Sequence, residues 1–302
     1  MGCGMSQVSG PEVVARTPAR ALRLAGWWWQ AIALGAVIAF LYAHILAFLV
    51  ADWWSDPNFS HGFFVPLFSG YLIWQHRHRL AQLQPEPSWL GLPVIAGALG
   101  VLVLGSLGAE LFLSRSSFVL LLAGLIIFYA GWRAFRAVSF EWAVLFLAIP
   151  IPTIVMNQIT LPLQFLASDL ASGFLSIVGV PVLRQGNIIQ LATMNLEVAE
   201  ACSGIRSLIS LITLAVIYGY FLESRTSLRI ALVLAAIPIA VFANATRIMA
   251  TGLTGLYWNP DKAQGFFHEF SGWVIFLLAL SMLLAVHGLV RWLARLGRGR
   301  SA

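Results

Sequence analysis

The chain has 302 residues, of which 60% are hydrophobic and only 10% are charged. A soluble globular domain carries about 25% charged residues, because its surface has to be polar. The composition therefore excludes soluble globular, disordered and fibrous proteins, and two cysteines are too few for a disulfide framework. It predicts an all-α polytopic membrane protein.

The net charge of +6 comes mainly from arginines that lie in short bursts between long apolar runs. A nucleic-acid-binding protein would gather such charge on one polar face. Bursts between apolar runs are instead typical of cytoplasmic membrane loops. We therefore expect no nucleic-acid partner, and we expect membrane lipid around most of the chain.

Hydropathy and the basic bursts together predict eight transmembrane helices, with every basic cluster on one side of the membrane. Both termini are then cytoplasmic, residues 1–24 as a flexible leader and residues 293–302 as a basic tail. The third and fourth spans form a hairpin with only Arg115 at its turn. The predicted spans are residues 27–50, 63–75, 91–113, 117–132, 137–156, 205–222, 230–256 and 270–290.

Two segments between the fifth and sixth spans do not fit a simple transmembrane helix. Residues 161–180 are apolar enough to cross, but the parity of the spans requires both of their flanks to lie outside. Polar side chains recur along one helical face of this segment, so we expect an interfacial or re-entrant helix, with a ninth span as the alternative. Residues 181–199 contain turn dipeptides and partial alternation, which predict a small extracytoplasmic β-hairpin over the mouth of the bundle.

Cys202 lies where this hairpin ends and the sixth span begins. The positive end of a helix dipole favours a thiolate at such a position, and Arg206, one turn later, adds to that effect. Lone membrane cysteines usually only fill space, but here Glu200 and Ser203 crowd around the thiol. Chemistry alone leaves both roles open, a nucleophile or a packing residue.

Asn244 and Arg247 interrupt the seventh predicted span. Arg247 lies eighteen residues beyond Arg229, or roughly 27 Å at the helical rise, which places it in the outer leaflet of a core about 30 Å thick. An arginine within the membrane costs about 2.5 kcal/mol or more unless it is paired or hydrated. It either snorkels to the outer interface or serves as a fixed cation that stabilises a carboxylate or an oxyanion.

His268 opens the last predicted span from the outer side. An imidazole is basic enough near neutral pH to accept a thiol proton, although interfacial histidines without a role are common. Cys202, Arg247 and His268 are expected on three separate helices at similar depth, and together they suffice for acyl transfer from a peptide bond. We expect no metal or cofactor, because His76 and His78 have no acidic or cysteine partner nearby and no phosphate-binding glycine motif is present.

Four motifs, in this order along the chain, resemble those of the exosortase/archaeosortase family, the multi-spanning membrane cysteine transpeptidases of bacteria and archaea. The hairpin fits as well, with Gly186 and Leu196-Glu197-Val198. The motifs are Phe59-Ser60-His61-Gly62-Phe63-Phe64-Val65-Pro66, Glu200-Ala201-Cys202-Ser203-Gly204-Ile205-Arg206, Asn244-Ala245-Thr246-Arg247-Ile248, and His268 with Gly272-Trp273.

The resemblance implies an exosortase-like transmembrane domain over residues 25–292, in the bacterial inner membrane, with its active site at the periplasmic face. It implies that Cys202 is the nucleophile, that His268 is the general base and acid, and that Arg247 stabilises charge. Supporting roles fall to Glu200, Ser203, Arg206, Asn244 and His61.

The partners that the resemblance implies are the C-terminal tails of exported proteins and an acyl acceptor that the sequence does not identify. Each tail carries a Pro-Glu-Pro-like motif, a transmembrane helix and an Arg-rich end. The alternative is a transporter, a lipid-handling protein or an exopolysaccharide-assembly subunit. In that alternative Arg247 binds an anionic group and Cys202 only packs.

Overall fold

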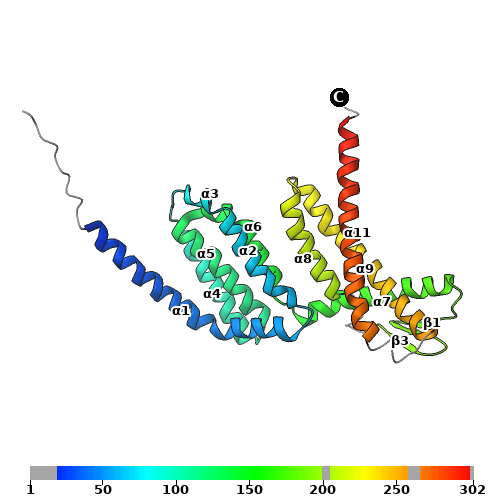
Figure 1. Ribbon diagram of the computed structural model, residues 1–302. Helices are drawn as coiled ribbons and strands as arrows, with labels where there is room; N and C mark the ends of the chain where they lie inside the picture. Colours follow the sequence, from blue (N-terminus) through cyan, green and yellow to red (C-terminus); the bar gives the residue numbers. More distant parts are fainter. Residues whose placement is uncertain (1–18, 199–204, 258–265, 300–302) are drawn as a thin grey trace, which may run out of the picture. The chain divides into compact units, whose positions relative to one another are not determined.

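The computed structural model describes residues 19–198, 205–257 and 266–299 of the chain (Figure 1). Side chains are described for residues 29–198, 205–257 and 272–292. The chain divides into two compact units, Met1–Ala47 and Phe48–Ala302. Helix α1 (Ala19–Ser55) runs through the first unit into the second, and all other described elements belong to the second unit.

Among the described residues, five helices are long and apolar enough to cross a membrane. A bent pair of helices gives a sixth candidate, so the predicted number of eight spans stays a prediction. Two of the predicted spans are short helices here, α2 (Phe64–Gln75, 12 residues) and α4 (Gly91–Leu107, 17 residues). At 1.5 Å per residue they measure about 18 and 26 Å, less than the ~30 Å hydrocarbon core. The five long helices are α1, α5 (Leu111–Ala137), α8 (Ile205–Leu222), α9 (Thr226–Tyr257) and α11 (Phe266–Gly299).

The bent pair covers the fifth predicted span, residues 137–156, which the bend interrupts, and most of the next segment, residues 161–180. It comprises α6 (Ser139–Val144) with the 3₁₀ turn η2 (Leu145–Ala148), and then α7 (Thr153–Ile177), at an angle of 80°. Pro150 and Pro152 stand at the bend, where they remove backbone donors and exclude a continuous helix. This geometry is that of a broken span or of a re-entrant loop.

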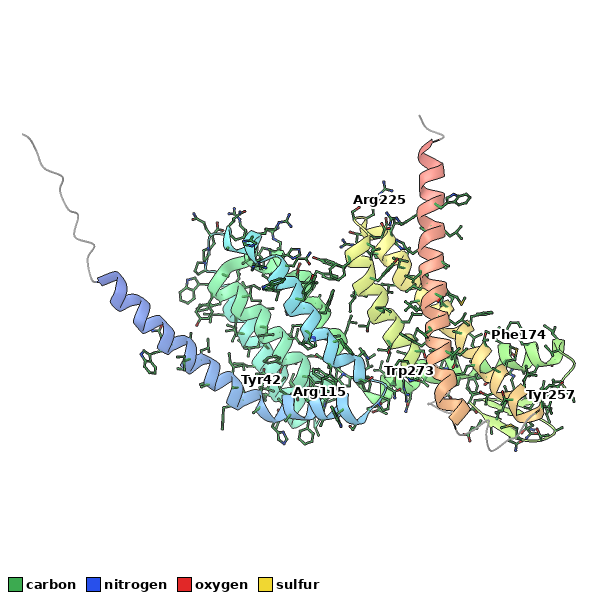
Figure 2. All side chains as sticks on the ribbon, in the orientation of Figure 1. Tyr42, Arg115, Phe174, Arg225, Tyr257 and Trp273 are labelled. Atoms are coloured by element: carbon green, nitrogen blue, oxygen red, sulfur yellow. The ribbon has the colours of Figure 1, made fainter. Side chains whose placement is uncertain are left out.

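Helices α4 and α5 form the predicted hairpin, but the expected position of Arg115 at its turn is wrong. The turn is made by Gly108 and Ala109, and Glu110 caps α5 by accepting a hydrogen bond from the Leu113 amide at 2.8 Å. Arg115, labelled in Figure 2, lies inside α5 and is 3% exposed. Its Nη2 pairs with Oδ2 of Asp52 at 2.6 Å. The carboxylate of Asp52 offsets the free-energy cost of burying this guanidinium. A buried arginine without such a partner would be strongly destabilising.

A small antiparallel sheet follows α7. It has three strands rather than the two of a hairpin: β1 (Leu183–Gln185), β2 (Ile188–Gln190) and β3 (Asn195–Glu197), in that spatial order. Gly186 adopts φ 64° in the tight turn between β1 and β2, a conformation that suits glycine. Arg184 of β1 pairs with Asp169 of α7 at 2.9 Å, which ties the sheet to that helix.

Two buried apolar clusters organise this part of the molecule. The bundle cluster joins α8, α9 and α11, whose buried residues recur every three to four positions as in packed helices. The sheet cluster joins α7, the sheet and the later part of α9. The bundle cluster contains Ile205, Leu208, Leu211, Ala215, Leu232, Ala236, Ile239, Ala240, Ala243, Ile275, Ala279 and Leu283. The sheet cluster contains Ala167, Ala171, Leu175, Val180, Ile189, Leu191, Leu196, Val198 and Ile248.

Candidate active site

The predicted nucleophile belongs to a segment outside the described residues. Cys202 lies in residues 199–204, together with Glu200 and Ser203. His268 lies in α11, but its side chain is also outside the described residues. The site is therefore built from the described residues that flank these positions.

The segment that carries Cys202 is anchored at both ends. Before it, the Val198 amide donates to the Asn187 carbonyl at 2.9 Å, and Asn187 Nδ2 donates back to the Val198 carbonyl at 3.2 Å. After it, Ile205 begins α8 and is 4% exposed. Val198 belongs to the sheet cluster and Ile205 to the bundle cluster.

The polar pair on α9 lies at the same boundary between the two clusters. Ala243 is the last α9 residue of the bundle cluster, and Ile248 is the α9 residue of the sheet cluster. Asn244 and Arg247 stand between them, Asn244 only 3% exposed and Arg247 half-buried. The described residues on either side of the Cys202 segment, and those on either side of this stretch of α9, therefore belong to the same two clusters.

Helix α11 brings the third predicted residue toward the same place. Arg247 lies against Gly272: a Cβ at Gly272 would be 3.6 Å from Nη2 and 3.8 Å from Cζ of Arg247. Position 268 precedes position 272 by four residues, about 6 Å along the same helical face. Ile275, three residues further on, is in the bundle cluster. The guanidinium of Arg247 is thus about one helical turn from the backbone of His268.

His61 is held by a different set of elements. It lies in the 3₁₀ turn η1 (Ser60–Phe63), and its Nε2–H donates to the Leu147 carbonyl of η2 at 3.2 Å. Burial lowers the pKa of His61 below its ordinary value of 6.5, so the imidazole is neutral at pH 7. Arg206, the other supporting residue that is described, is exposed on the first turn of α8.

Two pairs of histidine and carboxylate, each with a buried carboxylate, were missed from the sequence. His76 does have an acidic partner, contrary to expectation: its Nδ1 lies 2.9 Å from Oε1 of Glu141, which is 2% exposed in α6. His287 Nε2 lies 2.6 Å from Oε1 of Glu223. These partners are 65 and 64 residues apart in the chain, so no local pattern reveals them. Among the described residues, no group of three or more His, Cys, Asp or Glu could hold a metal ion.

The comparison with family models matched one family, described as transmembrane exosortase, over residues 53–285. The matched region is more than half of the chain and contains the Cys202 segment, α9 and the first turns of α11. The comparisons with curated proteins and with solved structures found no match. The chain therefore belongs to the transmembrane exosortase family.

Proposed function

We propose that this protein is a membrane cysteine peptidase or transpeptidase that cleaves C-terminal sorting signals of exported proteins through Cys202. One observation carries the proposal. The described residues that flank the Cys202 segment, Val198 and Ile205, belong to the sheet and bundle clusters, as do the residues that flank Asn244 and Arg247. The guanidinium of Arg247 also lies beside Gly272, on the helix that carries His268. A nucleophile, a base and a fixed cation on three separate segments are the groups that acyl transfer requires.

The chemistry follows from these three groups. The Cys202 thiol loses its proton to His268, and the thiolate attacks the carbonyl carbon of the scissile peptide bond. Arg247 stabilises the oxyanion that forms. The C–N bond then breaks, His268 returns the proton to the leaving amine, and a thioester remains on Cys202. An amine acceptor or water attacks the thioester, gives its proton to His268 and releases the Cys202 thiolate.

The substrate and the orientation are part of the same proposal. The substrate is a C-terminal tail with a Pro-Glu-Pro-like motif, a transmembrane helix and an Arg-rich end, whose helix places the motif at the outer membrane surface. The protein lies in the bacterial inner membrane with both termini in the cytoplasm, because its basic clusters fall on one side. A reporter inserted in residues 258–265 tests this orientation: a periplasmic signal is expected, and a cytoplasmic one contradicts it.

The decisive experiment uses the two cysteines of the chain as a matched pair. A tail-bearing substrate is co-expressed with the wild-type protein, with Cys202→Ala or with Cys3→Ala, and cleavage is followed by immunoblot. Cleavage is expected to disappear only with Cys202→Ala, and mass spectrometry of the native protein should find substrate joined to Cys202 as a thioester. Normal cleavage by Cys202→Ala overturns the proposal and leaves the alternative in which Arg247 binds an anionic group.

A further inference from the structure

Helix α11 has two glycines with described surroundings, and these surroundings differ. Among the described residues, a Cβ at Gly288 would meet nothing within 4 Å, whereas a Cβ at Gly272 would meet the guanidinium of Arg247, 3.6 Å from Nη2 and 3.8 Å from Cζ. Each glycine weakens a helix by roughly 0.5–1 kcal/mol relative to alanine. At Gly272 this cost coincides with the close approach of a charged group from α9 to the backbone of α11.

We propose that Gly272 is a positioning residue for Arg247. A side chain larger than alanine at position 272 would enter the space that the guanidinium occupies, one helical turn after His268. Arg247 is a long side chain with many rotamers, and a contact on α11 restricts where its charge lies. The inference rests on the proposed function, because it concerns where Arg247 lies relative to the reacting carbonyl.

The distances predict how different side chains at position 272 act. The Cβ of an alanine would stand 3.6 Å from Nη2 of Arg247, an ordinary van der Waals contact, so the guanidinium keeps its place. A leucine adds three further carbons beyond that Cβ, and the space next to it is occupied by Cζ and Nη2 of Arg247. The guanidinium must then move, and a displacement of about 1 Å in a catalytic group can cost about 10²-fold in rate.

The first test is a size series with a control in the same helix. Gly272→Ala is expected to cleave within about twofold of the wild-type rate, because the guanidinium keeps its place, and Gly272→Leu is expected to lose about 50-fold or more, as a lower kcat with little change in KM. Gly288→Leu makes the same change where a Cβ meets nothing within 4 Å, and its rate should stay within twofold of the wild type. All rates are divided by the amount of folded protein in the membrane. A Gly272→Leu rate equal to that of Gly288→Leu overturns the inference.

The second test does not use activity. The thermal unfolding midpoint in detergent is measured for Gly272→Leu in the wild-type background and in Arg247→Ala. If the leucine displaces the guanidinium, it lowers the midpoint in the first background and much less in the second, while Gly288→Leu shifts both equally. Equal shifts for Gly272→Leu in both backgrounds overturn the contact. Normal cleavage by Cys202→Ala together with this coupling would end the proposed function and leave the contact established.

Discussion

The bundle of α8, α9 and α11 has buried polar groups at both of its ends, and the two ends are built differently. At the Glu223 end, His287 makes contacts through both ring nitrogens, Nε2 with Oε1 of Glu223 at 2.6 Å and Nδ1 with the Tyr218 hydroxyl at 2.7 Å. Arg229 donates to the Glu223 carbonyl at 2.7 Å. At the Arg247 end, Nη2 of Arg247 lies 3.6 Å from the point where a Cβ at Gly272 would stand, and Asn244 is buried. Figure 2 labels Arg225 near the first end and Trp273 near the second.

This difference separates a structural network from a candidate site. The Glu223 end links α8, the loop after it, α9 and α11 through short contacts, and its acceptors and donors match one another. Such a network fixes helices because each buried polar atom is satisfied. The Arg247 end lies where the apolar core is interrupted between the bundle and sheet clusters. Both ends contain buried polar groups, so burial alone does not mark a site. The interruption of the apolar core is the feature that marks the Arg247 end as the candidate site.

The largest expected effect is the loss of activity at the Arg247 end. Arg247→Gln should lower the cleavage rate per folded molecule by about 10²–10³-fold, because a preorganised donor for the oxyanion is removed. Arg247→Lys keeps the charge but not the planar fork, and should recover less than a tenth of the wild-type rate. The measurement is single-turnover cleavage of a tail-bearing substrate in membranes.

Arg229→Gln is the matched control, because Arg229 is the arginine at the other end of the same helix. Its guanidinium donates to the carbonyls of Glu223 and Tyr220, so its loss should lower stability and leave the cleavage rate per folded molecule within about twofold. If Arg247→Gln cleaves at the wild-type rate, Arg247 belongs with the structural network and the contrast between the two ends is lost.

The sequence predicted most helices, but not the pairing between elements, and the place of the site stays a prediction. Long apolar runs and arginine bursts mark helices by local physics, and Asn244-Ala245-Thr246-Arg247 stood out because polar residues in an apolar run are costly. The partner of Arg115 is Asp52, 63 residues earlier, so the sequence left this arginine at a turn. The third strand, Asn195–Glu197, has only three residues, too few for a visible alternation.

The contact between Gly272 and Arg247 shows the same limit inside the site. The sequence marks both residues, one by its motif and one by its charge, but their meeting depends on how α9 and α11 pack. His287 carried no signal either, since a lone histidine near the end of an apolar span does not show that a carboxylate 64 residues away faces it. Local patterns predict which residues are chemically unusual, and packing decides which of them meet.

A smaller effect is expected at the Glu223 end. Glu223→Ala removes the acceptor of His287 and should lower the free energy of unfolding by about 1–2 kcal/mol, the range for interhelical polar contacts in membranes. The cleavage rate per folded molecule should stay within about twofold of the wild type. The measurement is a thermal or denaturant midpoint in detergent together with the cleavage rate.

Arg225→Ala changes an exposed residue of the same loop and should shift neither quantity measurably. A tenfold loss of cleavage rate in Glu223→Ala without loss of stability would mean that the Glu223 end takes part in the reaction. The contrast between a structural network at one end and a candidate site at the other would then be lost.

The smallest effect tests whether His61 has a structural role or a role in the site. Its motif suggested the site, whereas its hydrogen bond to Leu147 suggests a structural role. Burial lowers the pKa of His61 below 6.5, so the unfolded chain takes up a proton as the pH falls through 6.5 while the folded protein does not. Stability contributed by the neutral imidazole is thus complete above pH 6.5 and declines as the pH falls toward the folded pKa.

His61→Gln should remove this part of the decline, a change of less than about 2 °C in the thermal midpoint between pH 7.5 and 5.5. The exposed His78, changed to Gln, should keep the wild-type pH dependence. If His61→Gln keeps it too, burial of this imidazole does not contribute to stability, and the structural role is contradicted.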